Sequence, residues 1–117
     1  PAFLFRAGEG VGTVTLPGLG LEIGGPAINA TPRRLITGEL TTILEENGLS
    51  GKIKEVVVTI SVPGGKELAA RTFNPKLGII GGISIIGTSG IVRTFSNILV
   101  LHVGDIDFSS RITVALL

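Results

Sequence analysis

The most continuous apolar segment of the chain runs from Leu77 to Val92 and combines branched aliphatic residues with glycines, without a single charge. A short apolar run bounded by turn residues is typical of a strand buried on both faces, so the sequence predicts such a strand here. The interrupting glycines indicate close approach of a second backbone or of a ligand. The four residues Gly87, Thr88, Ser89 and Gly90 then form either a ligand-contacting loop or a tight buried corner.

A period of 3.6 residues in the apolar positions predicts one long helix over residues 32–47. Thr31 is placed to cap its N-terminus, Pro32 suits the first helical position, and an Asn-Gly pair at 47–48 marks its end. Gly38 lies inside this helix at a cost of about 1 kcal/mol relative to alanine, which predicts close packing at that position. The residues expected on the buried face are Leu35, Ile36, Leu40, Ile43 and Leu44.

Strands are expected before and after this helix in the sequence. Residues 55–62 alternate between apolar and more polar positions, which predicts a strand with Val57 on the polar face. A short helix is expected over residues 66–72, ending before Asn74, because a residue that precedes proline avoids the helical region. Asn74 either bonds its own backbone in a turn or reaches a ligand. Shorter strands are expected at residues 1–5, 97–103 and 111–117.

A glycine-rich turn at residues 7–12 carries Gly8, Gly10 and Gly12 in the pattern Gly-x-Gly-x-Gly, which invites a nucleotide-site interpretation. In Rossmann-type sites such a turn opens a helix, whereas here it opens a Thr-Val-Thr run that prefers a strand. The turn is therefore expected in a β-hairpin or bulge. Glu9 is its one charge, and this carboxylate either faces a ligand or is solvated.

The passage over residues 17–29 is rich in glycine and proline, and its apolar anchors predict an ordered loop of the kind that often carries function. It ends at Asn29, close to the expected helix. Arg33 and Arg34 follow in the first turn of that helix, where the helix dipole disfavours cations. The two arginines either hold an anionic group against the helix N-terminus or are solvated, and the sequence leaves both alternatives open.

Composition excludes several classes of function. Only 16% of the 117 residues are charged, against roughly 25% in an ordinary soluble domain. Ten basic and nine acidic residues are mixed along the chain, so no basic stripe indicates nucleic-acid binding. No apolar run reaches the roughly 20 residues of a membrane span. Cysteine is absent and His102 is the single histidine, so neither a thiolate nor a histidine-rich metal site is expected.

Three long segments of this chain resemble the CbiD family. They are GEGVGTVTLPGLGL at residues 8–21, GGPAINATPRRLI at residues 24–36 and TISVPGGKELAARTFNPKLGIIGGISIIGTSGIVR at residues 59–93, and they occur in the family's order. The combination of SVPGG, TFNP-x-LGI and GGIS-x-x-GT-x-GIV is specific. Members of the family are described as cobalt-precorrin-5B methyltransferases, which act on ring carbon 1 in anaerobic cobalamin biosynthesis.

The resemblance implies a cytoplasmic enzyme that uses S-adenosylmethionine as methyl donor and a cobalt-corrinoid rich in carboxylates as substrate, without a protein-bound metal. The glycine loops and the two arginines would line the cleft for donor and substrate. Glu9 is a weak candidate for a catalytic base. The candidate binding residues are Gly8, Gly10, Gly12, Asn29, Arg33, Arg34, Asn74, Gly87, Thr88, Ser89 and Gly90.

The chain also departs from the family pattern. Family members are much longer, with an earlier region around a Thr-Thr-Gly-x-Cys motif and a Rossmann-like domain after the GIVR match, and Thr94 replaces the usual proline. We therefore expect a partial copy, either a fragment or a chain that lacks internal residues. A second class of function stays open, namely a non-catalytic module that docks through its apolar face to a partner or forms a homo-oligomer.

The expected fold class is α+β, with a glycine-rich mixed or antiparallel sheet, one long helix and one short helix. Residues 1–94 are expected to form the glycine-rich domain. Residues 95–117 are expected to supply tail strands, which belong either to that domain or to an incomplete second, Rossmann-like domain.

Overall fold

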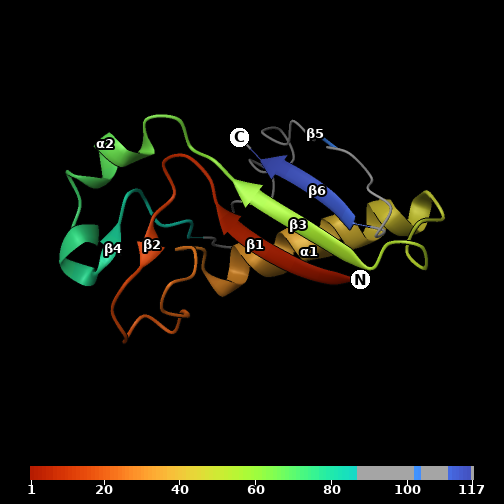
Figure 1. Cartoon of the computed structure of the whole chain (residues 1–117), viewed down its shortest axis with the longest axis horizontal. Helices are drawn as coiled ribbons and strands as arrows, with labels where there is room; N and C mark the ends of the chain where they lie inside the picture. Colours follow the sequence, from red (N-terminus) through yellow and green to blue (C-terminus); the bar gives the residue numbers. More distant parts are fainter. Residues whose placement is uncertain (87–101, 104–110, 117) are drawn as a thin grey trace.

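The computed structural model describes residues 1–86, 102–103 and 111–116, the last two ranges by their backbone. It consists of two sheets and one long helix (Figure 1). The larger sheet has the strand order β1-β3-β6-β5, and the smaller sheet pairs β2 with β4. The elements are β1 (Ala2–Ala7), β2 (Thr13–Val14), α1 (Ala30–Glu46), β3 (Glu55–Ile60), α2 (Gly65–Ala69), the 3-10 helix η1 (Asn74–Leu77), β4 (Ile79–Ile80), β5 (His102–Val103) and β6 (Arg111–Leu116).

The larger sheet is mixed, because β3 pairs in parallel with both β1 and β6, whereas β5 runs antiparallel to β6. The predicted α+β class and mixed sheet are thereby confirmed. β6 joins the same sheet as β1, while the division of the chain into two domains stays a prediction. Val57 was placed on a polar face by its sequence pattern, but it is only 3% exposed. That prediction was wrong because a central parallel strand is buried on both faces.

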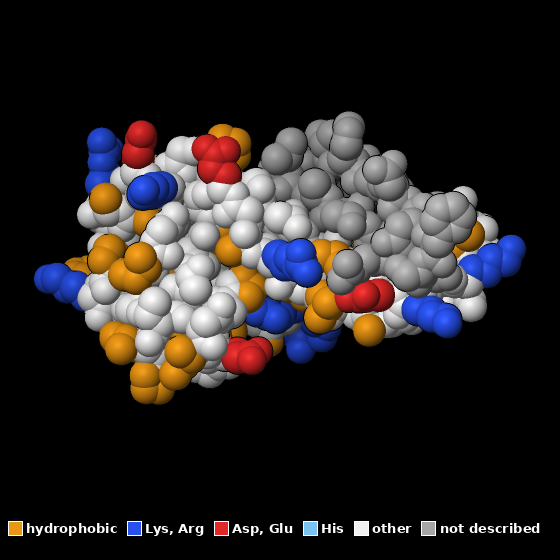
Figure 2. Space-filling view, viewed as in Figure 1, with side chains coloured by type: hydrophobic (Ala, Val, Ile, Leu, Met, Phe, Trp, Pro, Cys, Tyr) orange, Lys and Arg blue, Asp and Glu red, His pale blue; other side chains and the backbone are white. Residues whose placement is uncertain are grey.

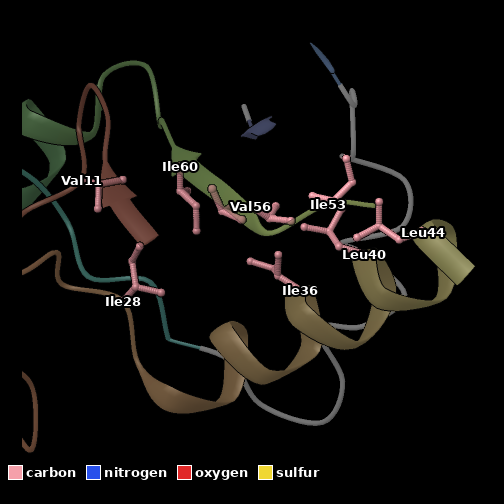
Figure 3. Packing of buried hydrophobic residues seen from close by; sticks show 9 residues of the cluster. Val11, Ile28, Ile36, Leu40, Leu44, Ile53, Val56 and Ile60 are labelled. Atoms are coloured by element: carbon pink, nitrogen blue, oxygen red, sulfur yellow. The ribbon is translucent and has the colours of Figure 1, made fainter. Parts of the chain in front are cut away.

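The main hydrophobic core lies between α1 and the larger sheet. Ile36, Leu40 and Leu44 are buried on α1, and Figure 3 shows the side chain of Ile36 directed toward Val56 and Ile60 of β3. Full burial of one such side chain contributes about 1.5–3 kcal/mol relative to leaving it exposed. The helical period in the sequence therefore identified the correct buried face.

The helix begins two residues earlier than predicted. Asn29 is the N-cap residue, with an extended backbone at φ −71° and ψ 166°, so the prediction that Thr31 caps the helix was wrong. Pro32 is a buried residue within the first turn rather than its first position. The backbone N–H of Asn29 donates to the carbonyl oxygen of Ile85 at 3.0 Å. This long-range bond holds the chain extended up to Asn29, and the helix starts directly after it.

Gly38 lies on the exposed side of α1, and a methyl group added to it would meet no atom within 4 Å. The predicted close packing at this position was therefore wrong. We expect Gly38→Ala to raise the free energy of unfolding by about 0.5–1 kcal/mol, because alanine favours the helix and restricts the unfolded chain. Urea unfolding followed by circular dichroism checks this, and a midpoint at or below that of the parent chain would contradict it.

The smaller sheet lies at the other end of the molecule, together with α2 and η1 (Figure 1). The predicted helix over residues 66–72 is shorter than expected, since α2 ends at Ala69 and η1 begins at Asn74. The Thr72 hydroxyl accepts a hydrogen bond from the Asn74 backbone N–H at 3.1 Å. The turn is thus closed by the threonine side chain rather than by the predicted Asn74 side chain.

The described part of the long apolar segment is buried on one side only. Ile79 is 4% exposed, whereas Ile80 and Ile86 are 53% and 61% exposed, so the predicted strand buried on both faces was wrong. Within β4, Ile79 faces the interior and Ile80 faces outward. Beyond β4 it continues as isolated parallel bridges, Ile83 to Val11 and Ile85 to Ile28.

Candidate functional site

Backbone hydrogen bonds connect the glycine-rich turn to the start of α1. Gly12 donates to the carbonyl oxygen of Ile83 at 2.9 Å, and Ala27 donates to that of Gly12 at 2.8 Å. Ile85 then donates to Ala27 at 2.8 Å, and Asn29 donates to Ile85. The ladder ends at the helix N-cap, so it determines where the helix begins relative to the glycine-rich turn. The three segments that meet here are residues 8–12, 27–29 and 83–85.

Gly10, Gly65 and Gly82 form a glycine junction in which three backbone segments touch without intervening side chains. A methyl group on Gly65 or on Gly82 would overlap the carbonyl oxygen of Gly10. Gly10 has φ 77°, and a methyl group there would overlap the carbonyl oxygen of Val62. The Gly10 carbonyl oxygen also accepts a hydrogen bond from Ile83 at 2.9 Å. Packing of the chain against itself therefore requires all three glycines.

The other two glycines of the turn are also packed against the chain. The Gly8 N–H donates to the carbonyl oxygen of Ile60 at 2.8 Å, and a methyl group on Gly8 would overlap the Ser61 hydroxyl. A methyl group on Gly12 would lie 2.8 Å from the carbonyl oxygen of Gly82. Gly8, Gly10 and Gly12 thus each have a packing role, and a ligand contact at these three positions stays a prediction.

A different set of glycines is open. A methyl group added to any of them would meet nothing within 4 Å, and their positive φ angles favour glycine by conformation alone. At these positions a ligand could approach the backbone closely. A glycine pattern in the sequence does not distinguish packed from open positions, so these glycines carried no signal of their own. They are Gly18, Gly20, Gly24, Gly48, Gly64 and Gly81.

Arg33 is half-buried and is held by the chain. Its Nε donates to the carbonyl oxygen of Ile28 at 2.8 Å, and one terminal nitrogen donates to that of Pro26 at 3.4 Å. Its guanidinium also lies 5.4 Å from the centre of the Phe5 ring, within the range of a cation–π contact. The solvated alternative was therefore wrong for Arg33. The side chain connects the first turn of α1 to the loop before it and to β1.

Arg34 has a different environment from Arg33. Its side chain is exposed, and no hydrogen bond or ion pair joins its guanidinium to another residue in the described part of the chain. The first turn of α1 contains no acidic residue, and the Asn29 side chain makes no cap hydrogen bond. Helix N-termini attract anions, and a guanidinium can bind a carboxylate through two hydrogen bonds. Asn29 and Arg34 are therefore the predicted residues best placed to receive an anionic group.

Asn74 and Glu9 have different surroundings from Asn29 and Arg34. Asn74 belongs to η1, beside the smaller sheet (Figure 1). Glu9 is exposed, and its backbone carbonyl accepts a hydrogen bond from Val62 at 2.7 Å. The predicted loop of Gly87, Thr88, Ser89 and Gly90 lies outside the described residues.

Among the residues that the structure describes, no group of three or more histidine, cysteine, aspartate or glutamate side chains could hold a metal ion. No helix within that part of the chain has the length and apolar character needed to cross a membrane.

The profile of the CbiD family matches residues 1–94. A cobalt-precorrin-5B C(1)-methyltransferase of Pseudomonas fluorescens (strain Pf0-1) is 56% identical over 96 residues, which are 82% of this chain and 26% of the relative. The protein of the same name from Pseudomonas syringae pv. syringae (strain B728a) is 60% identical over 92 residues, covering 79% of this chain and 24% of the relative. The chain thus spans about a quarter of the length of these curated relatives. No solved structure gives a significant match.

Proposed function

Because this chain belongs to the CbiD family over residues 1–94, we propose that it forms part of a methyltransferase acting on ring carbon 1 of cobalt-precorrin-5B. The supporting observation is the identity of 55–60% to curated relatives that carry this name. The proposal includes S-adenosylmethionine as methyl donor and the cytoplasm as the place of the reaction, in keeping with the resemblance in the motifs.

In this proposal the chain supplies binding and orientation. The substrate carries carboxylate side chains, and the start of α1 offers the exposed Arg34 guanidinium beside a helix N-terminus without acidic residues. Arg33 is a positioning residue, because its hydrogen bonds to Ile28 and Pro26 hold the loop that leads into the helix. Arg34 would therefore contact the substrate, whereas Arg33 would keep the helix start in place.

For the methyl donor, the open glycines of the loop after β2 fit better than the packed turn at residues 8–12. An adenosyl group needs backbone that it can approach, and Gly18, Gly20 and Gly24 leave that space free. The donor supplies a methyl group on a positively charged sulfur. Transfer requires this methyl group to be held in line with ring carbon 1, about 3 Å away. Ring carbon 1 would supply the electron pair of the new carbon–carbon bond, and the electron pair of the broken carbon–sulfur bond would leave with the donor's sulfur.

The test is a chimera in which residues 1–94 replace the matching segment of the Pseudomonas fluorescens relative. We expect the chimera to methylate cobalt-precorrin-5B in the presence of S-adenosylmethionine, as detected by product mass. Arg34→Gln in the chimera is expected to raise the KM for the corrinoid about tenfold with little change in thermal midpoint, since it removes a charge-assisted hydrogen bond.

Arg33→Gln is the matched control, because it removes the same charge one residue earlier on α1. It is expected to lower the thermal midpoint through the loss of its bonds to Ile28 and Pro26. A folded chimera that forms no methylated product would exclude the proposed function. Equal KM values for the Arg34→Gln chimera and its parent would exclude the role proposed for Arg34.

A further inference from the structure

The exposed large hydrophobic side chains are concentrated at one end of the molecule. Of the eight in the described part of the chain, only Leu4 and Ile86 lie elsewhere. Figure 2 shows several hydrophobic patches on the end that α2, η1 and the smaller sheet form in Figure 1. We call this surface the apolar end, and it consists of Leu16, Ile23, Leu68, Phe73, Leu77 and Ile80.

Local contacts place Leu16, Phe73 and Leu77 near one another on the apolar end. The Leu16 side chain lies against Gly78, and the Thr15 N–H donates to the Gly78 carbonyl oxygen at 2.8 Å. Leu77 precedes that glycine, and its N–H donates to the carbonyl oxygen of Phe73 at 3.1 Å. These contacts join the end of β2 to η1 through backbone hydrogen bonds. The apolar side chains are thus presented by a structured surface.

The exposure of these side chains is large. Phe73 is 74% exposed, and the five aliphatic members are 47–57% exposed. Together they present on the order of several hundred Å², the size at which a patch on a protein surface marks an interaction site. Lys66, Arg71 and Lys76 lie exposed on α2 and η1 or between them, with Glu67 as the acidic residue among them. A partner surface that fits is therefore apolar with an acidic rim.

We propose that the apolar end packs against the part of a full-length CbiD-family protein that lies outside the segment matched here. The matched 96 residues are only 26% of the Pseudomonas fluorescens relative, so most of that relative's chain is available to cover this surface. Interfaces between domains of one chain bury about 600–1,500 Å² in total, which suits a patch of this size. A stable dimer of copies needs about 800 Å² from each partner, which is more than these six side chains offer.

Covalent linkage explains how a patch of this size is enough to hold two parts of one protein together. A domain on the same chain is present at a high effective concentration, so modest apolar burial is enough to keep the two parts together. The inference rests on family membership and on surface exposure, and it does not depend on the proposed methyl transfer.

The test compares Phe73→Asp in two proteins, the 117-residue chain and the chimera with the Pseudomonas fluorescens relative. In the 117-residue chain we expect an unchanged urea midpoint, because Phe73 is exposed there. In the chimera we expect a thermal midpoint several degrees lower, because the new carboxylate would be buried against the rest of the protein. Ser50→Asp, at an exposed position beyond the end of α1, is the charge-matched control and is expected to alter neither midpoint appreciably.

Three results would overturn the inference. The first is a chimera whose thermal midpoint is the same with and without Phe73→Asp. The second is a chimera that aggregates although both parent proteins stay monodisperse, since the two surfaces would then not fit. The third is a dimer of the 117-residue chain that Phe73→Asp converts to monomer in sedimentation velocity, which would assign the apolar end to a second copy. Methylation activity is not used as a readout, so failure of the proposed function leaves this test intact.

Discussion

Gly82→Ala is expected to lower the free energy of unfolding by about 3 kcal/mol, at the upper end of the cost of overpacking a filled interior. Gly82 is buried, and the added methyl group would overlap the Gly10 carbonyl oxygen. That oxygen also accepts the hydrogen bond from Ile83, so it cannot move away without loss of the bond. Urea unfolding followed by circular dichroism measures the effect.

Substitutions at two further glycines separate steric overlap from backbone strain as the cause of the lost stability. Gly51 is exposed, has no atom within 4 Å of an added methyl group and lacks a positive φ, so Gly51→Ala should leave the midpoint nearly unchanged. Gly81 has equally open space but φ 88°, so Gly81→Ala should show only the cost of backbone strain, about 1 kcal/mol. If Gly82→Ala is no more destabilising than Gly81→Ala, the glycine junction is not closely packed.

Ile28→Ala is expected to cost about 3 kcal/mol, within the range of 2–5 kcal/mol for truncating a buried isoleucine. Ile28 is fully buried in the main core, where Figure 3 shows it below Val11 at one end of the cluster. Its backbone carbonyl oxygen also receives the hydrogen bond from Arg33. A cavity at this position therefore affects both the core and the loop that leads into α1. Calorimetric and urea unfolding of the variant measure the loss.

Ile23→Ala is the matched control, because it removes the same atoms from a side chain that is 57% exposed. We expect a change within about 0.5 kcal/mol for this exposed position. Ile28→Val should be intermediate, with a loss of about 0.5–1.5 kcal/mol. Equal losses for Ile28→Ala and Ile23→Ala would contradict the assignment of Ile28 to the core.

The long helix and the central strand could be predicted because their signals are local. Ile36, Leu40 and Leu44 recur at the helical period, and the β-branched run from Val56 to Ile60 favours a strand. The helix start could not be predicted. Thr31 and Pro32 are good residues for a helix N-terminus, but a hydrogen bond from Asn29 to Ile85 decided where the helix begins.

The candidate site was predicted less well than the fold. Arg33 and Arg34 are identical residue types in one turn, and the sequence offered no reason to separate them. The structure separates them, because the loop over residues 26–28 supplies carbonyl oxygens to Arg33 only. The packing roles of Gly8, Gly10 and Gly12 could not be predicted from the sequence either, since the atoms that these glycines contact belong to residues more than fifty positions away.

The sequence by itself determined the elements whose signals lie within one or two turns of chain, namely the period of α1, the strand tendency of β3 and the family motifs of residues 8–93. Only the tertiary structure decided which glycines are packed, which arginine finds hydrogen-bond partners among the described residues, and which apolar residues stay exposed at the end formed by η1 and the smaller sheet. The physical reason is the range of the interactions. Helix and strand propensities act between near neighbours, whereas backbone contact, burial and long-range hydrogen bonds depend on segments that meet only after folding.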